Sequence, residues 1–201
     1  MSRRIRPLVL AGALAVALAL TGCTSSSDDL AKQYNAGDSK GYIAGDGSVT
    51  EIPVDEREDP VEFDGTIEDG SEVSSADYAG EVVVVNFWYA SCAPCRAEAP
   101  DLKKISEKFE GNGASFLGVN VRDQAASAIA FNESYKIGYP SVMDVKGGRM
   151  QLAFSGSIPP NAVPTTLVLD SSGRVAARIL GQVNTPSILE TLIEDTIAED
   201  D

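Results

Sequence analysis

The sequence of 201 residues contains no histidine, only three cysteines and a single tryptophan. Without histidine, the chain lacks the side chain that most often moves protons near neutral pH and that most often binds metals. A closed structural zinc site needs about four nitrogen or sulfur ligands, and three cysteines do not supply them. We therefore expect no metal site and no bound cofactor.

Positive charge is also scarce. Lysine and arginine together number 16, against 30 aspartates and glutamates, which gives a formal net charge of −14. An acidic surface is a poor match for nucleic acid or for anionic lipid headgroups. Partners should be proteins or lipid-embedded molecules, and any attachment to a membrane should come from something other than a basic patch.

The N-terminal segment carries targeting information. Three arginines precede an apolar run, Leu8–Leu20, which is short for a permanent membrane span. The run ends in Leu-Thr-Gly before Cys23 and resembles a bacterial lipobox, which implies a signal peptide over residues 1–22 and a lipid on Cys23. This would hold the chain on the extracytoplasmic face of the cell membrane. An ordinary secretory signal with an incidental cysteine, or an uncleaved anchor, remains an alternative.

Composition then divides the rest of the chain. Residues 23–40 are polar without apolar periodicity, and we interpret them as a flexible tether. Residues 41–60 combine apolar pairs, a Gly-Asp-Gly turn and a charged stretch, which predicts a short hairpin and a linker. Residues 61–198 have a length that suits one domain.

Within that domain the apolar pattern alternates between strand and helix. Its strongest feature is Glu81–Trp88, whose near-continuous apolar run indicates a central strand covered on both faces. Strands and helices then alternate, and a hairpin and a last helix follow. The expected elements are a helix over Ala93–Phe109, a strand over Ser115–Val121, a helix capped by Asp123, a short helix over Arg149–Phe154, strands over Thr165–Leu169 and Arg174–Leu180, and a helix that opens with Pro186 and buries Ile188, Leu192 and Ile193. This order predicts an α/β, thioredoxin-like fold with a central mixed β-sheet flanked by helices and an N-terminal hairpin extension.

Two cysteines separated by two residues follow the central strand and open the next helix. At a helix N-terminus the backbone N–H groups favour a thiolate, so Cys92 should be the acidic, exposed nucleophile. Cys95 lies one turn further into the helix and could resolve a mixed disulfide. Half of a zinc site, a structural disulfide and two inert thiols are the alternatives.

The run from Trp88 to Cys95, together with Glu98 and Pro100, resembles the TlpA/ResA branch of the thioredoxin superfamily over about residues 61–197. The resemblance implies a membrane-tethered bacterial thiol–disulfide oxidoreductase in which Glu98 acts near the thiols. Asn86 stands where thioredoxin has an acid, and an amide cannot accept the proton of Cys95. Glu98 or water must then relay it, unless Glu98 is only a solvated helix carboxylate.

A second constellation, Val163, Pro164 and Thr165, precedes a strand. The resemblance implies that Pro164 is cis and faces the cysteines, so that Val163 can pair with an extended substrate. Trp88 is expected to bind substrate beside them. A loop proline at the first residue of a strand is the alternative.

These features predict a monomeric disulfide reductase. The resemblance implies that a membrane thiol carrier supplies electrons and that protein disulfides such as those of apocytochrome c are substrates, as in cytochrome c maturation. A thiol oxidase that forms disulfides and a thiol peroxidase are alternative enzymes, and a non-catalytic binding lipoprotein is an alternative from a different class.

Overall fold

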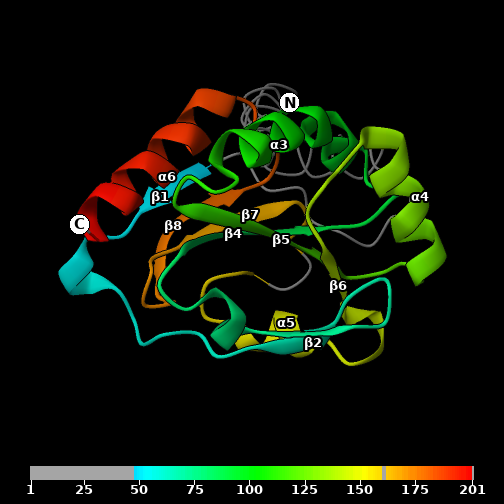
Figure 1. Ribbon diagram of the computed structural model, residues 1–201, viewed down its shortest axis with the longest axis horizontal. Helices are drawn as coiled ribbons and strands as arrows, with labels where there is room; N and C mark the ends of the chain where they lie inside the picture. The colour runs from blue at the N-terminus through cyan, green and yellow to red at the C-terminus, as the bar shows by residue number, and fades with distance from the viewer. Residues whose placement is uncertain (1–47, 160–161, 201) are drawn as a thin grey trace, which may run out of the picture. The chain divides into compact units, whose positions relative to one another are not determined.

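A computed structural model describes residues 48–159 and 162–200 (Figure 1). The eight strands in these ranges are β1 (Ser48–Glu51), β2 (Asp64–Thr66), β3 (Glu72–Ser74), β4 (Val82–Trp88), β5 (Ala114–Asn120), β6 (Ser141–Met143), β7 (Thr165–Leu169) and β8 (Val175–Leu180). The α-helices are α3 (Ala93–Phe109), α4 (Ala125–Tyr135), α5 (Arg149–Ala153) and α6 (Pro186–Asp200). Three short 3-10 helices cover Val54–Glu56, Ser75–Tyr78 and Asp144–Lys146.

Several predictions concern residues that precede Ser48. The signal peptide (1–22), the lipid on Cys23, the tether (23–40) and the first arm of the expected hairpin all lie outside the described residues. Among the helices that are described, none has the length and apolar character needed to cross a membrane.

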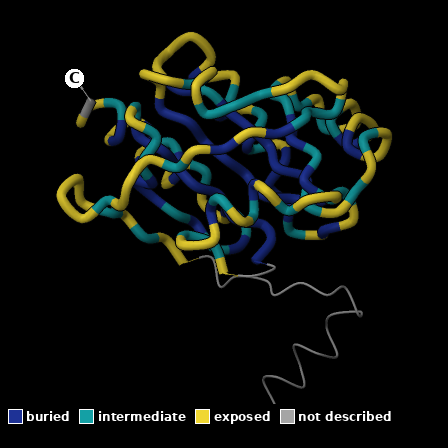
Figure 2. The backbone as a smooth tube through the Cα atoms, turned by 90° about the horizontal axis from the view of Figure 1, so that it is seen from below, coloured by how far each residue is buried: buried dark blue, intermediate teal, exposed yellow. Residues whose placement is uncertain are grey.

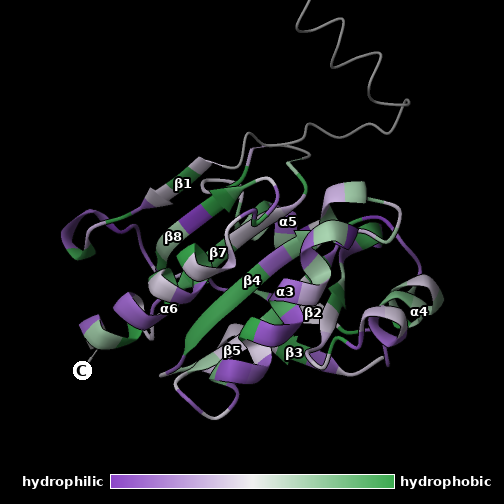
Figure 3. Ribbon diagram, turned by 90° about the horizontal axis from the view of Figure 1, so that it is seen from above, coloured by the Kyte–Doolittle hydropathy of each residue, from purple (hydrophilic) through white to green (hydrophobic). Residues whose placement is uncertain are grey.

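The main sheet has six strands in the order β1-β8-β7-β4-β5-β6. β4, β5 and β6 run parallel to one another, whereas β7 pairs antiparallel with both β4 and β8. All seven residues of β4 are buried because the strand is central and covered on both faces, and Figure 3 shows it as a largely hydrophobic ribbon. This mixed sheet confirms the predicted thioredoxin-like fold.

Helices cover the two faces of the sheet differently. α3 and α6 lie together over one face, where their apolar side chains share a core with β4, β5, β7 and β8. α5 and the β2–β3 hairpin lie on the opposite side, and Phe154 belongs to the core of that face. Figure 2 shows buried segments running through the middle of the domain and exposed segments around them.

Some local predictions are corrected. Ile188 is 40% exposed and Leu189 is buried instead, since Leu189, Leu192, Ile193 and Thr196 form the i, i+3, i+4, i+7 stripe that faces the sheet. α4 begins after Gln124 without a side-chain cap, so Asp123 is not its capping residue.

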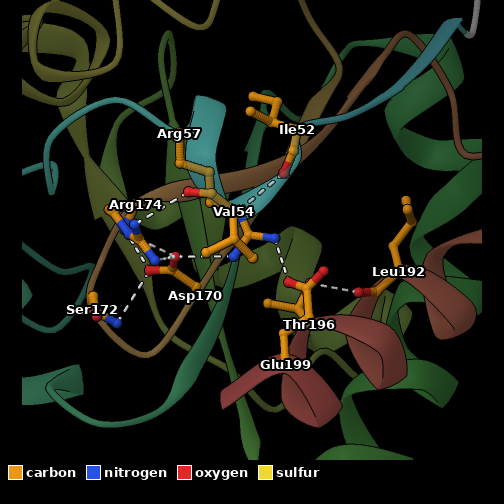
Figure 4. Close-up of polar contacts among 9 residues, drawn as sticks. All are labelled: Ile52, Val54, Arg57, Asp170, Ser172, Arg174, Leu192, Thr196 and Glu199. Carbon is orange, nitrogen blue, oxygen red and sulfur yellow. Dashed lines mark hydrogen bonds and ion pairs between the residues drawn. The ribbon is translucent and has the colours of Figure 1, made fainter.

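The N-terminal part of the described chain joins the domain instead of standing apart from it. β1 pairs antiparallel with β8, adding an edge strand to the main sheet. Beyond it, Arg57 is held by the buried carboxylate of Asp170, with Nη1 and Oδ2 3.1 Å apart, and by Glu199 of α6 (Figure 4). Asp170 also accepts hydrogen bonds from Arg174 and from the backbone N–H of Ser172. One buried carboxylate thus organises the β7–β8 turn and anchors the segment that follows β1.

Candidate active site

The two cysteines of the predicted motif lie where β4 ends and α3 begins, and they form a disulfide with their Cα atoms 5.3 Å apart. Cys92 is the N-cap of α3, and its Sγ accepts a hydrogen bond from the backbone N–H of Cys95 at 3.2 Å. An N-cap sulfur faces the positive end of the helix dipole. The sulfur that the sequence identified as the nucleophile therefore sits where a thiolate would be stabilised.

Both sulfurs are buried in this oxidised form. The exposed fraction is 0% for Cys92 and 2% for Cys95, so the expectation of an exposed Cys92 is wrong for the disulfide. The pair belongs to an apolar cluster that includes Trp88, Tyr89 and Val163, which exclude solvent from it. In this oxidised form, solvent therefore has almost no access to either sulfur.

Glu98 lies one helical turn beyond Cys95 and is only 1% exposed, which rules out a solvated surface carboxylate. Its Oε1 accepts a hydrogen bond from Asn86 Nδ2 at 3.0 Å, and its Oε2 accepts one from the backbone N–H of Val183 at 2.9 Å. Burial raises the pKa of Glu98 from 4.5 to about 7, although both hydrogen bonds oppose that rise. A carboxyl group that exchanges its proton near neutral pH therefore lies behind the disulfide.

Asn86 links this carboxyl group to the rest of the site. Its Nδ2 also donates to Thr166 Oγ1 at 3.1 Å, so one amide connects β4, α3 and β7. Asn86 and Cys95 also line a cavity of about 10 Å³, with Asn132 and Tyr139 on its other walls. That volume is close to the space that one water molecule needs.

The Val163–Pro164 peptide bond is cis, as the sequence resemblance implied. Val163 is 4% exposed and packs in the same cluster as the disulfide. Trp88 is also 4% exposed: its ring lies 4.3 Å from that of Phe131, and its Nε1 donates to Ser141 Oγ at 3.3 Å. The indole is therefore part of the buried cluster that contains the two cysteines, and contact of Trp88, Val163 and Pro164 with substrate stays a prediction.

A set of residues that the sequence did not single out for the site follows β5. The backbone N–H of Val121 donates to Trp88 O at 3.1 Å, and the guanidinium of Arg122 lies 4.2 Å from the centre of the Tyr89 ring. Asp123 accepts a hydrogen bond from the backbone N–H of Ala90. The sequence offered a signal, the polar residues Asn120, Arg122 and Asp123 at the end of a buried strand, but Asp123 also fitted a helix cap.

In the part of the chain that the structure describes, no group of three or more aspartate, glutamate or cysteine side chains is placed so that it could hold a metal ion. What the site does contain is a disulfide at a helix N-terminus, a buried carboxyl group and a cis-proline loop. This arrangement can carry out thiol–disulfide exchange without any other group.

Comparisons with known proteins agree with that chemistry. The Redoxin family matches residues 48–193. The thiol-disulfide oxidoreductase ResA of Geobacillus thermodenitrificans is 29% identical over 124 residues, which cover 62% of this chain and 68% of the relative. ResA of Bacillus subtilis is 27% identical over 126 residues, covering 63% and 65%.

Solved structures give the same picture. A secreted thiol-disulfide isomerase from Corynebacterium glutamicum superimposes with a TM-score of 0.69 and 30% identity, covering 78% of this chain and 96% of its own. A DsbF homologue from Corynebacterium diphtheriae gives a TM-score of 0.66 and 34% identity, covering 77% and 99%.

Proposed function

Because this chain belongs to the Redoxin family and is a TlpA/ResA-like thiol–disulfide oxidoreductase, we propose that it works as a disulfide reductase on the outer face of the cytoplasmic membrane. Lipid on Cys23 would hold it there, and a membrane thiol carrier would supply its electrons. Its substrates would be protein disulfides, including those of apocytochrome c. The relatives named above catalyse thiol–disulfide chemistry, and one of them is described as secreted.

The reaction follows from the positions of the two sulfurs. The Cys92 thiolate attacks one sulfur of the substrate disulfide, and the other substrate sulfur leaves as a thiolate with the bonding electron pair. Cys95 loses its proton and attacks Cys92 Sγ, which breaks the mixed disulfide and releases the second substrate thiolate. The product is the Cys92–Cys95 disulfide seen here. Two electrons and two protons from the carrier then restore the dithiol.

Glu98 is the group proposed to handle the Cys95 proton. It shares a helix face with Cys95 and is buried, with a pKa of about 7, so it can take up and return a proton at neutral pH. Asn86 lines the small cavity at Cys95 and donates a hydrogen bond to the Glu98 carboxylate, so the surroundings between the two groups are polar, although the amide itself cannot carry the proton. No histidine exists in the chain to do this work.

The buried carboxyl group is also the observation that carries the direction of the reaction. An oxidant of this fold draws its strength from a stabilised thiolate in the reduced form. Glu98 is buried one helical turn from Cys95, so its ionised form opposes a negative charge on the nearby sulfur and disfavours the reduced, ionised pair. This makes the dithiol a better electron donor, which favours a reductase over a disulfide-forming oxidase.

The substrate would lie along Val163. A cavity of about 320 Å³ begins at this residue and extends past Val121 to Leu152, which is 73% exposed. We expect an extended substrate segment to pair with the Val163 backbone and to place an apolar side chain in this cavity. Disulfides within folded, polar surfaces would be poorer substrates than those in unfolded chains.

The midpoint potential tests the direction. The full chain in detergent is equilibrated in thiol buffers of known potential, and the Cys92–Cys95 pair is quantified by alkylation and mass spectrometry. A midpoint below about −200 mV supports the reductase, and one near −120 mV, the range of strong oxidants, overturns it.

Labelling with a radioactive fatty acid tests the lipid anchor. Cys23→Ser should lose the label and release the protein from membranes. If the variant keeps both the label and its attachment to membranes, Cys23 is not the anchor.

A further inference from the structure

The three residues that follow β5, residues 121–123, contact the three residues that lead toward the cysteines, residues 88–90. The parallel pairing of β4 and β5 ends at Trp88 and Asn120, yet contacts continue beyond it. The backbone N–H of Val121 donates a hydrogen bond to Trp88 O, and the Arg122 guanidinium lies over the ring of Tyr89. Asp123 Oδ2 accepts a hydrogen bond from Ala90 N at 2.6 Å. The end of β4 and the first two residues of the loop before Cys92 are therefore in contact with a single neighbouring segment.

The carboxylate of Asp123 is itself fixed in place. Its Oδ2 also accepts a hydrogen bond from Asn120 Nδ2 at 2.9 Å. Asn120 is fully buried, and its Oδ1 accepts hydrogen bonds from the backbone N–H of Arg122 at 3.1 Å and of Asp123 at 2.7 Å. This turn leaves Asp123 little freedom to swing away, so its bond to Ala90 is preorganised.

We propose that Asp123 is a positioning residue for Cys92. By fixing Ala90, it fixes the turn in which the Cys92 N–H donates to Tyr89 O at 3.1 Å. That turn keeps Cys92 Sγ at the first N–H groups of α3, where the thiolate is stabilised. The inference rests on the thiol–disulfide exchange activity of the cysteine pair and is independent of the direction in which that activity runs.

Loss of this bond should slow attack by Cys92. In a loosened loop, Sγ would spend less time at the helix N-terminus, so the Cys92 pKa would rise and less thiolate would be present at neutral pH. A purely electrostatic role predicts the opposite sign, because removing a negative charge near a thiolate lowers the thiol pKa. Three other charged groups lie around the loop: Arg122 over Tyr89, Arg96 in α3 and the buried Glu98.

The experiment uses the full chain in detergent with two substitutions and one matched control. Asp123→Ala removes the acceptor, whereas Asp123→Asn removes the charge but keeps an acceptor oxygen. The control is Asp69→Ala, since Asp69 Oδ1 accepts a hydrogen bond from Ser71 N at 2.8 Å in the turn between β2 and β3. Each reduced protein is measured for the pH dependence of Cys92 alkylation, for the rate of exchange with a small aromatic disulfide and for its melting temperature.

We expect Asp123→Ala to slow exchange at pH 7 about tenfold, the effect of losing one well-placed hydrogen bond to a charged group, and to raise the Cys92 pKa. Asp123→Asn and Asp69→Ala should stay within twofold of the wild type. The proposal is overturned if Asp123→Ala is also within twofold, if both Asp123 variants lower the pKa, or if Asp69→Ala is equally slow.

Two further controls keep these outcomes interpretable. Should Asp123→Ala not fold, Asp123→Ser takes its place, because it also lacks the carboxylate that accepts from Ala90, while its backbone N–H can still donate to Asn120 Oδ1 within the turn. The same slowing and the same rise in Cys92 pKa are expected, and wild-type values would overturn the proposal. If the folded wild type itself exchanges no thiols, the activity assignment fails, which is a different result from equal rates in wild type and variant.

Discussion

Replacing Glu98 by glutamine tests whether burial raises the pKa of the Glu98 carboxyl group and so makes the stability of the protein depend on pH. Glu98 is 1% exposed, and burial raises its pKa from 4.5 to about 7. A shift of one pKa unit corresponds to about 1.4 kcal/mol, so a rise of this size lowers the stability of the folded, ionised protein by about 3 kcal/mol.

The sign fixes the pH window. Below pH 4.5 the carboxyl group is protonated in both folded and unfolded chains, and its burial carries no ionisation penalty. Between about pH 4.5 and 7 the unfolded chain gives up its proton first, so the free energy of unfolding falls as the pH rises. Above about pH 7 the folded chain ionises too, and the loss levels off. Glutamine carries no proton to lose and removes this dependence.

The glutamine variant should keep its fold. Glu98 accepts one hydrogen bond at each oxygen, from Val183 and from Asn86. A glutamine can still accept from Val183 with its oxygen, and its amide can donate to Asn86 once the Asn86 side chain rotates by 180°. Thr166 has a hydroxyl group that can then donate to the same amide oxygen.

Urea unfolding of the oxidised proteins between pH 4 and 9 measures the effect. The wild type minus Glu98→Gln difference in the free energy of unfolding should fall by about 3 kcal/mol from pH 4 to pH 8, because other titrations cancel. Glu107→Gln, a substitution at an exposed carboxylate of the same helix, is the control for loss of a surface carboxylate. A Glu98 difference that changes by less than about 1 kcal/mol, or that rises with pH, would refute the reasoning.

Three more predictions follow from the geometry. Cys95→Ser should trap the mixed disulfide with a substrate, seen by mass spectrometry as an adduct that dithiothreitol removes, and its absence would deny Cys95 the resolving role. Arg57→Ala should lower the free energy of unfolding by about 2 kcal/mol, since Asp170 keeps other donors but loses a buried cation, and a change below 0.5 kcal/mol would contradict the anchor. Gly65→Ala should cost about 1–3 kcal/mol because its Cβ would collide with Val142, and adding Val142→Ala should restore part of that loss in the same unfolding assay, whereas strictly additive costs would show that the two residues do not collide.

Much of the fold could be predicted because its signals are local. The bounds of α3, Ala93–Phe109, are those predicted, since apolar residues at helical spacing follow directly on a cysteine that caps the helix. β4 was recognisable from an apolar run that only Asn86 interrupts. The β2–β3 hairpin was missed because each strand has three residues, too few to establish a period of two.

The site was harder to predict where its contacts join distant parts of the chain. Asn86 meets Thr166 across 80 residues and Glu98 meets Val183 across 85, and no local pattern encodes such pairs. Helical spacing placed Glu98 on the face of Cys95 but could not say that this face is buried. Asp123 was misjudged for a different reason. Aspartate is typical of helix caps, but this one accepts a hydrogen bond from Ala90 in the loop before Cys92 instead.

The edge strands of the main sheet affect how readily two molecules could join their sheets at high local concentration. Among the described residues, the sheet ends in a strand of four residues, β1, on one side and a strand of three, β6, on the other, where Ile67 adds a single bridge to Val142. Long unpaired borders invite other chains to add strands, and short ones give them little to extend. Molecules gathered on a surface at high local density would therefore resist joining sheet to sheet, which keeps each disulfide available to its substrate.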